Sequence, residues 1–195
     1  MSVLLPLARS FSDSLNQILA LRPAYPRDAR MIQAWRRDSR TSTTLRLFDR
    51  STKEIARELS AATAIDLYLG HAAKFTWIIL RGEMPAGWIA VSLDSVDPQR
   101  AELSYATSRR HEGQGIMTQA LTALFRQLLS DSHVRELAAR CFTWNTRSIR
   151  VLEKLGFARD GEDSLPGACG PERVIRYGLT LATDTERDSK GAIWR

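Results

Sequence analysis

The chain has 195 residues, of which 44% are hydrophobic and 26% are charged, so it is long enough for one domain with a substantial core. Its formal net charge is +6, and the basic residues are dispersed instead of alternating with aromatic side chains, which argues against a nucleic-acid-binding module. Its apolar runs are all shorter than the roughly 18 residues of a membrane-spanning helix, which argues against a membrane protein.

The first residues, 1–9, lack the basic segment and long apolar run of a signal peptide, so we expect a cytoplasmic protein. Cys141 and Cys169 have no close partner in the sequence, and the three histidines are scattered. We therefore expect neither a disulfide framework nor a bound metal.

The first half of the chain predicts a short strand, two helices and then a run of strands. We expect residues 1–15 to be an irregular extension, 16–183 a single domain and 184–195 a flexible tail. The predicted elements are a strand at 18–22, a helix at 27–38, a helix from Ser51 or Thr52 to about Ala62, and strands at 75–80, 87–93 and 101–107. Short turns join the three later strands, which is typical of an antiparallel meander.

The second half predicts a helix, a strand, a helix and a strand. Apolar residues recur at helical spacing over 116–129, and 134–142 alternates like a strand. Asn145 is placed to cap a helix that ends near Gly156, and a last strand covers 174–182. The segment 160–171, rich in glycine, proline and acids, predicts a loop. The result is an α/β fold with a mixed sheet, in which 101–142 forms a parallel strand–helix–strand unit.

One motif stands out between the strand at 101–107 and the helix that begins at Ile116. It reads Arg110-His111-Glu112-Gly113-Gln114-Gly115-Ile116. The two glycines allow the backbone to approach a ligand closely, and the free N–H groups at a helix start favour an anion. The loop is shorter than a P-loop and does not fit Gly-x-Gly-x-x-Gly. It therefore predicts an anion cradle of another kind.

This loop resembles the pyrophosphate loop of the GNAT superfamily of N-acetyltransferases, and further segments resemble its RimJ/RimL type. They are Leu21-Arg22-Pro23 with Asp28-Ala29, Ala101–Tyr105, His111–Met117, and Asn145–Ser148 followed by Val151–Phe157. Together they extend from about Ile18 to Leu181. The resemblance implies a GNAT fold, with a twisted and mostly antiparallel sheet that is splayed between the family's fourth and fifth strands and flanked by helices.

The resemblance also implies acetyl-CoA as co-substrate and assigns its binding residues. The backbone of Leu103, Ser104 and Tyr105 would pair with the pantetheine arm, and Asn145 would face that arm. The pyrophosphate would lie on the 110–116 loop, with a charged contact from Arg110 and backbone contacts from His111, Glu112, Gly113, Gln114, Gly115 and Ile116. Asn145 is equally explained as a helix cap.

Many family members carry a tyrosine in the last helix as general acid, but the matching residue here is Leu152. RimL-like enzymes resemble this chain in having a serine three residues after the asparagine, so Ser148 is our candidate to assist departure of the thiolate. Glu102 is the candidate general base, directly or through water, with Glu162, Asp163 and Glu172 as alternatives. Each of these acids and Ser148 could instead be an ordinary structural residue.

The sequence thus indicates an acetyltransferase acting on a primary amine, with the N-terminal α-amino group of an acidic, ribosomal-type protein as the expected acceptor. A small-molecule amine such as a polyamine or an antibiotic is one alternative, and a non-catalytic CoA-binding sensor is another. The sequence leaves open whether the protein is a monomer or a homodimer.

Overall fold

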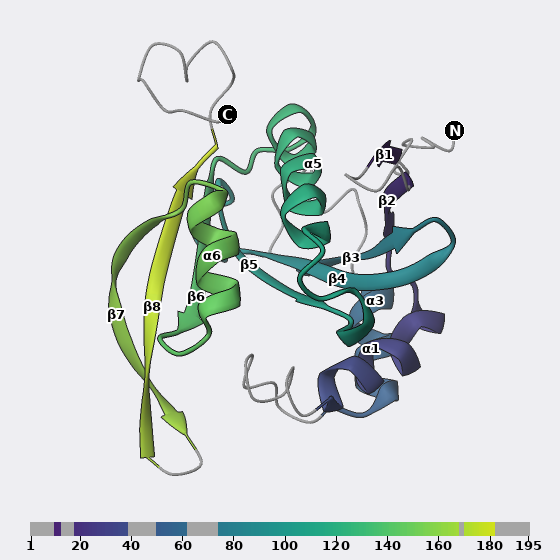
Figure 1. The fold of residues 1–195 in the computed structure, drawn as a ribbon, viewed down its shortest axis with the longest axis horizontal. Helices are drawn as coiled ribbons and strands as arrows, with labels where there is room; N and C mark the ends of the chain where they lie inside the picture. Colours follow the sequence, from purple (N-terminus) through teal and green to yellow (C-terminus); the bar gives the residue numbers. More distant parts are fainter. Residues whose placement is uncertain (1–9, 13–17, 39–49, 62–73, 168–169, 182–195) are drawn as a thin grey trace.

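The computed structural model describes residues 10–12, 18–38, 50–61, 74–167 and 170–181. They form one eight-stranded sheet with the order β1-β2-β3-β4-β5-β6-β8-β7 (Figure 1). Neighbouring strands run antiparallel except β5 (Arg100–Thr107) and β6 (Glu136–Phe142), which are parallel. The predicted α/β class and mixed sheet are confirmed.

The predicted meander forms the first half of the sheet. The strands β2 (Ile18–Pro23), β3 (Lys74–Arg81), β4 (Met84–Leu93) and β5 follow one another in space as in sequence. Within the expected N-terminal extension, Ser10–Ser12 forms the short strand β1, which pairs with β2. Residues 1–9 and the tail 184–195 lie outside the described residues.

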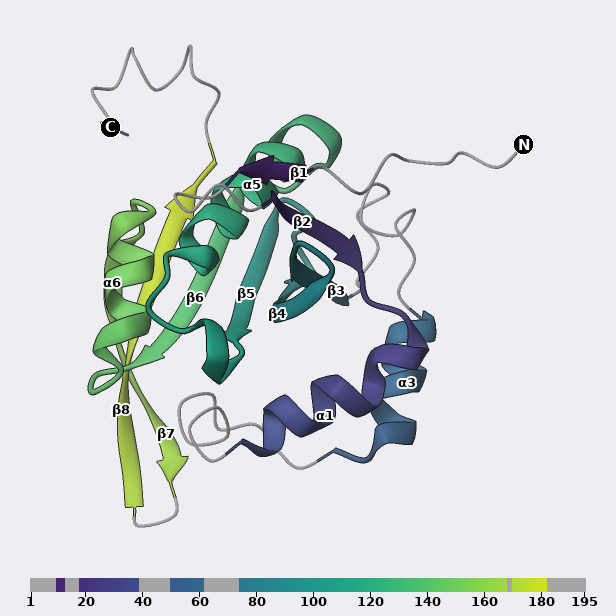
Figure 2. The same cartoon turned by 45° about the vertical axis from the view of Figure 1, so that its right-hand side comes forward.

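Two predicted helices cover one face of this half. A 3-10 turn, η1 (Pro26–Asp28), leads into α1 (Ala29–Arg37), and α1 lies beside α3 (Thr52–Ala61) in both views (Figures 1 and 2). Ile32, Ile55 and Leu59 bury their side chains against Ile78 and Trp88 of the sheet. This layer is joined to β2 by Arg22, whose guanidinium donates two hydrogen bonds of 2.7 Å to Asp28.

The larger core lies on the opposite face, under α5 (Ile116–Asp131) and α6 (Thr146–Lys154). The apolar stripe predicted for the helix at 116–129 is confirmed, since Ala120, Leu121 and Leu124 are fully buried. No helix in the described part of the chain is long and apolar enough to cross a membrane.

The predicted loop at 160–171 is wrong. Its described residues, 160–167 and 170–171, belong to an antiparallel hairpin of β7 (Ala158–Gly167) and β8 (Gly170–Thr180), and β8 also pairs with β6. The acids that suggested a loop face arginines on the neighbouring strand, in the pairs Glu162–Arg173 and Asp163–Arg176. Cross-strand ion pairs of this kind support a solvent-exposed hairpin that propensity alone does not predict.

Candidate active site

The sheet opens between its two parallel strands. β5 and β6 pair only from Arg100–Glu136 to Glu102–Ala138, although β5 continues to Thr107 and β6 to Phe142. From Leu103 onward, β5 is paired with β4 on one side, and the ladder with β6 has ended. The expected splay between these strands is confirmed. It leaves backbone groups of 103–105 available to an extended ligand, whereas the side chain of Leu103 is buried in the core.

The glycine loop lies between β5 and α5 and has the backbone that its glycines predict. A 3-10 turn, η2 (Arg109–His111), precedes it, and Gly113 and Gly115 both have φ of +74°. A Cβ atom at Gly113 would meet no atom within 4 Å, and one at Gly115 would meet only the Gln119 amide at 3.9 Å. Positive φ therefore explains the two glycines, and the open space beside them fits a ligand that approaches the backbone.

This loop is a positively charged environment. Arg81 of β3 hydrogen-bonds the side chain of Gln114, whose amide nitrogen donates to the Arg110 carbonyl at 3.1 Å. His111 Nδ1 lies 2.9 Å from the Ser108 hydroxyl. Partial burial, together with the charges of Arg81 and Arg110, lowers the pKa of His111 below its ordinary value. Of these causes, the charges of Arg81 and Arg110 also favour an anion, whereas burial does not.

The β6–α6 turn presents Asn145 beside the opening. The ring of Trp144 stacks on that of Phe142 at 5.3 Å, and the Asn145 N–H donates to the Phe142 carbonyl at 2.9 Å. The Asn145 side chain then accepts from the Ser148 N–H at 3.2 Å, so Asn145 is the N-cap of α6. The predicted cap is confirmed, as is the left-handed residue after the helix, Gly156, with φ of +82°.

Ser148, in the first turn of α6, meets a side chain from β5. The Tyr105 hydroxyl lies 2.9 Å from Ser148 Oγ. Burial raises the pKa of Tyr105 far above its ordinary value, although the hydrogen bond with Ser148 opposes this shift. Cys141 of β6 lies nearby, with Sγ 3.7 Å from the Asn145 carbonyl oxygen, and burial raises the pKa of its thiol. These groups form a neutral, hydrogen-bonded cluster where the two strands separate.

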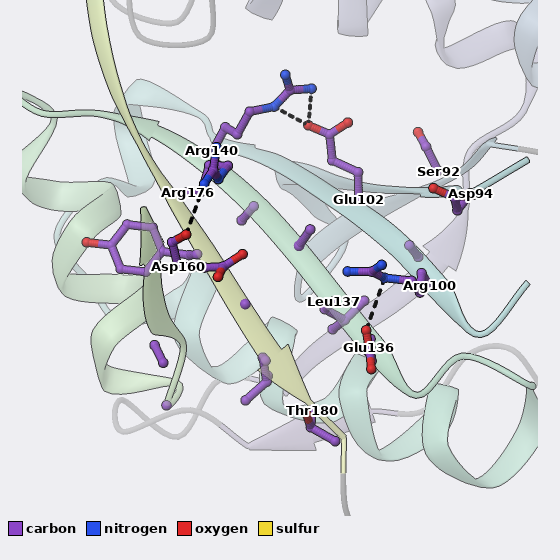
Figure 3. A pocket seen from close by; sticks show the side chains of 18 of the residues that line it. Ser92, Asp94, Arg100, Glu102, Glu136, Leu137, Arg140, Asp160, Arg176 and Thr180 are labelled. Atoms are coloured by element: carbon purple, nitrogen blue, oxygen red, sulfur yellow. Dashed lines mark hydrogen bonds and ion pairs between the residues drawn. The ribbon is translucent and has the colours of Figure 1, made fainter. Parts of the chain in front are cut away.

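Glu102 lies elsewhere. Its side chain alternates with the buried Leu103 and lies in a groove of about 1170 Å³ that is lined by β4, β5, β6, the C-terminal end of α6 and the β7–β8 hairpin (Figure 3). There one carboxylate oxygen accepts hydrogen bonds of 3.0 and 2.7 Å from Arg140. Among the described residues that line this groove there is neither Asn145 nor Ser148, and no residue of the 110–116 loop. The structure therefore brings Ser148, Asn145 and Tyr105 together but places Glu102 on the other face of the sheet.

Two side chains of this site did not follow from the sequence. Tyr105 was expected to act through its backbone, yet its hydroxyl is the partner of Ser148. Arg147 forms an ion pair with Glu112 and so joins α6 to the glycine loop. Tyr105 lies two positions after Leu103 on the same strand, so both side chains lie on the same face of the sheet. This alternation could have predicted that the Tyr105 side chain faces the site. Glu112 and Arg147 are 35 positions apart in the sequence, and no comparable pattern connects them. Among the described residues, no group of three or more His, Cys, Asp or Glu side chains could hold a metal ion.

A mixed sheet that opens between two parallel strands beside a glycine-rich anion loop defines the GNAT class of folds. The family profile described as the acetyltransferase (GNAT) domain matches residues 19–158. The chain therefore belongs to the GNAT acetyltransferase family.

A curated relative is the ribosomal-protein-serine acetyltransferase of Escherichia coli, which is 32% identical over 73 residues. That match covers 36% of this chain and 41% of the relative, so the chain matches less than half of the relative's length.

Two solved structures share the fold. The Salmonella typhimurium acetyltransferase that modifies the N-terminal serine of ribosomal protein L7/L12 superimposes with a TM-score of 0.69 at 19% identity, covering 84% of this chain and 95% of that one. The spermidine N-acetyltransferase of Vibrio cholerae, solved with CoA and spermine, gives 0.71 at 13% identity over the same shares. At these identities the likeness concerns the fold alone.

Proposed function

We propose that the protein transfers an acetyl group from acetyl-CoA to a primary amine, and that the acceptor is the α-amino group of a protein. The observation that carries this proposal is the combination of the β5–β6 opening, the glycine loop at one end of it and the Tyr105–Ser148 pair beside it. The family supports acetyl-CoA as the donor. The relative that acetylates a ribosomal-protein serine supports a protein acceptor.

In this proposal, each part of acetyl-CoA meets a separate part of the chain. Backbone N–H groups of residues 111–116 hold the pyrophosphate, with Arg110 and Arg81 supplying positive charge. The pantetheine arm takes the place of a strand beside Leu103, Ser104 and Tyr105, where the ladder to β6 has ended. This path carries the thioester toward α6, where Asn145 and Ser148 begin the helix.

The chemistry proposed here is direct attack of the amine on the thioester. Among the described residues, Cys141 is a free cysteine, and burial raises the pKa of its thiol. Little of it is therefore present as the thiolate that could compete as a nucleophile. The proton of the acceptor ammonium must leave before attack, because only the free amine has a lone pair. Glu102 stays our candidate for this base. Because it is paired with Arg140 on the other face of the sheet, it would have to act through water.

The charges on the described surface favour an acidic acceptor over a polycation. Four acids that could attract a polyamine are matched by arginines, in the pairs Glu102–Arg140, Glu112–Arg147, Glu162–Arg173 and Asp163–Arg176. The net charge of +6 is therefore not reversed by these acids. A small-molecule amine stays the second candidate, because the Vibrio cholerae enzyme of the same fold is a spermidine acetyltransferase.

The test is incubation of the full-length protein with isotope-labelled acetyl-CoA and a cell extract, followed by mass spectrometry of intact proteins and of small amines. We expect label on the α-amino group of a protein and release of free thiol. Label on polyamines alone would move the function to the second candidate. Binding of CoA with no transfer to any amine would favour a sensor.

A further inference from the structure

Tyr105 and Ser148 are brought together from two separate elements, β5 and α6, that border the opening in the sheet. The Tyr105 hydroxyl lies 2.9 Å from Ser148 Oγ and 3.5 Å from the Ser148 carbonyl oxygen. The first distance is that of a good hydrogen bond and the second is marginal. The hydroxyl of Ser148 is therefore the main partner of a tyrosine that comes from a different strand.

The direction of this hydrogen bond follows from the chemistry of the two groups. A phenol is more acidic than an aliphatic hydroxyl and is the better donor, and a buried tyrosine hydroxyl needs a partner. Ser148 Oγ therefore accepts from Tyr105, and its own single proton is left for a different partner. Burial raises the pKa of Tyr105, so this phenol stays protonated and acts as a donor throughout the physiological range.

Ser148 is fixed from two sides. Asn145 Oδ1 accepts from its backbone N–H at 3.2 Å, and Tyr105 holds its hydroxyl. Cys141 also hydrogen-bonds the Ser148 side chain, which opposes the rise in the pKa of its thiol caused by burial, but a neutral thiol is a weak acceptor. A thiolate that forms in the opening is a better acceptor for the Ser148 proton than the neutral Cys141 thiol.

We propose that Tyr105 is a positioning residue that orients the Ser148 hydroxyl toward the sulfur of the leaving thiolate. It does so from β5, whereas α6 carries Leu152 one turn after Ser148. This inference rests on the proposed acetyl transfer. From the sequence we expected a role only for the backbone of Tyr105, whereas this inference gives a role to its hydroxyl.

The step balances without any proton leaving Tyr105. The ammonium of the acceptor first gives one proton to a base or to water, and the nitrogen lone pair forms the C–N bond to the thioester carbon. The C–S bond then breaks with its electron pair on sulfur. A second proton from the nitrogen ends on that sulfur, which leaves an amide and the free thiol of CoA. Ser148 donates a hydrogen bond to the sulfur while it carries the negative charge, and Tyr105 donates to Ser148.

The alternative is that Tyr105 only ties β5 to α6. The two roles differ in the acidity of the thiol of bound CoA. A donor aimed at the sulfur stabilises the thiolate and lowers the pKa of that thiol, whereas a structural tie does not. The ultraviolet absorbance of the thiolate reports this pKa for full-length protein loaded with CoA. Desulfo-CoA, which lacks the thiol, gives the matched reference for binding.

We expect Tyr105→Phe to raise the pKa of the bound thiol and to lower kcat roughly tenfold, which corresponds to about 1.4 kcal/mol. Ser148→Ala should lower kcat roughly 10- to 1,000-fold. In the double variant, Tyr105→Phe should lower kcat little further, because both substitutions remove the same hydrogen bond to the sulfur. The affinity for desulfo-CoA should not change. Tyr177→Phe, which removes a buried hydroxyl from β8, is the control and should alter none of these quantities.

The assignment is overturned if Tyr105→Phe leaves the thiol pKa and kcat at wild-type values, or if it weakens desulfo-CoA binding and thermal stability in parallel. It is also overturned if the losses of the two single variants multiply in the double variant. These results are distinct from failure of the proposed function, which would appear as wild-type protein that binds no desulfo-CoA, or that binds it but transfers no acetyl group to any amine. Because the thiol titration needs no acceptor, it tests Tyr105 even before the acceptor is known.

Discussion

Glu112 of the glycine loop and Arg147 of the first turn of α6 form an ion pair that joins the two structures bordering the opening in the sheet. The Arg147 side chain is 68% exposed and that of Glu112 is 24% exposed. A carboxylate inside an anion cradle opposes the binding of a pyrophosphate, and Arg147 offsets its charge. The pair therefore links the charge of the loop to the position of the helix that carries Asn145 and Ser148.

Replacing Arg147 should weaken the binding of CoA. In Arg147→Ala the Glu112 carboxylate loses the charge of Arg147, and we expect the Kd for CoA to rise roughly 2- to 5-fold at low salt, the scale of an exposed ion pair. Glu112→Gln should not weaken binding, and the double variant should recover most of the loss. Calorimetry at two salt concentrations checks this. A Kd for Arg147→Ala equal to that of the wild type would show that the pair has no part in binding.

The glycine loop gives a second prediction, with a matched control elsewhere in the chain. Gly115→Val places a β-branched residue at a φ of +74°, in the space that the pyrophosphate would occupy, and should abolish measurable CoA binding. Gly82, in the β3–β4 turn, has φ of +58° and equally open surroundings. Gly82→Val should cost similar stability but leave CoA affinity intact. Unchanged affinity in a folded Gly115→Val protein would contradict the cradle.

The sequence predicted the parts of this site that depend on local backbone rules. Gly113 and Gly115 predict positive φ, and Asn145 predicts a helix start. Each of these residues lies within a few positions of the structure that it causes. Ion pairs and hydroxyl contacts between elements leave no such signal. Tyr105 and Ser148 are 43 positions apart in the sequence, so they meet only after the segment between them has folded.

The hairpin of β7 and β8 was missed for a related reason. Gly161, Pro166, Gly167 and Pro171 are residues that interrupt strands in isolation. Their segment becomes a strand because β8 pairs with β6 on one side and with β7 on the other. The arginines that complete the pattern, Arg173 and Arg176, stand in the second strand, so the alternation of charges becomes visible only in the paired register.

His111 should couple CoA binding to proton uptake. In the free protein, burial and the charges of Arg81 and Arg110 lower its pKa, and an adjacent phosphate should raise it again. Because the bound form has the higher pKa, the affinity gained from His111 is present below that pKa and is lost as the pH rises through it. Calorimetry near pH 6.5, the ordinary histidine value, in buffers of different ionisation enthalpy measures the uptake. His111→Asn should reduce it and His133→Asn should not; equal uptake in all three proteins would refute the coupling.

Asp28 should contribute to stability in a pH-dependent way. Burial alone would raise its pKa, but the hydrogen bonds from Arg22 and the Tyr25 N–H, with the charge of Arg22, outweigh burial and lower it. Asp28→Asn should lower the free energy of unfolding by about 2–3 kcal/mol near neutral pH, because it leaves Arg22 without its counter-charge. Since the folded pKa is the lower one, the contribution is full above about pH 3.9 and is lost as the pH falls through the folded value. Urea denaturation at several pH values tests this, with the exposed Glu83→Gln as control, and a constant difference down to low pH would contradict it.

The acceptor itself should show the influence of the net charge of +6. An acidic peptide with a free N-terminus is attracted by this field, whereas spermidine and an aminoglycoside are repelled unless carboxylates near the site reverse it. The arginine partners of Glu162 and Asp163 remove two of the carboxylates that could do so. Salt screens the attraction over a Debye length of ~10 Å at 0.1 M. We therefore expect kcat/KM for the acidic peptide to fall roughly 3- to 10-fold with added salt, mainly through KM.

The kcat/KM of an uncharged peptide with the same first residue should change little with salt, and the same peptide with a blocked N-terminus should not react. Rapid acetylation of spermidine with no reaction of either free peptide would show that the enzyme acts on small molecules.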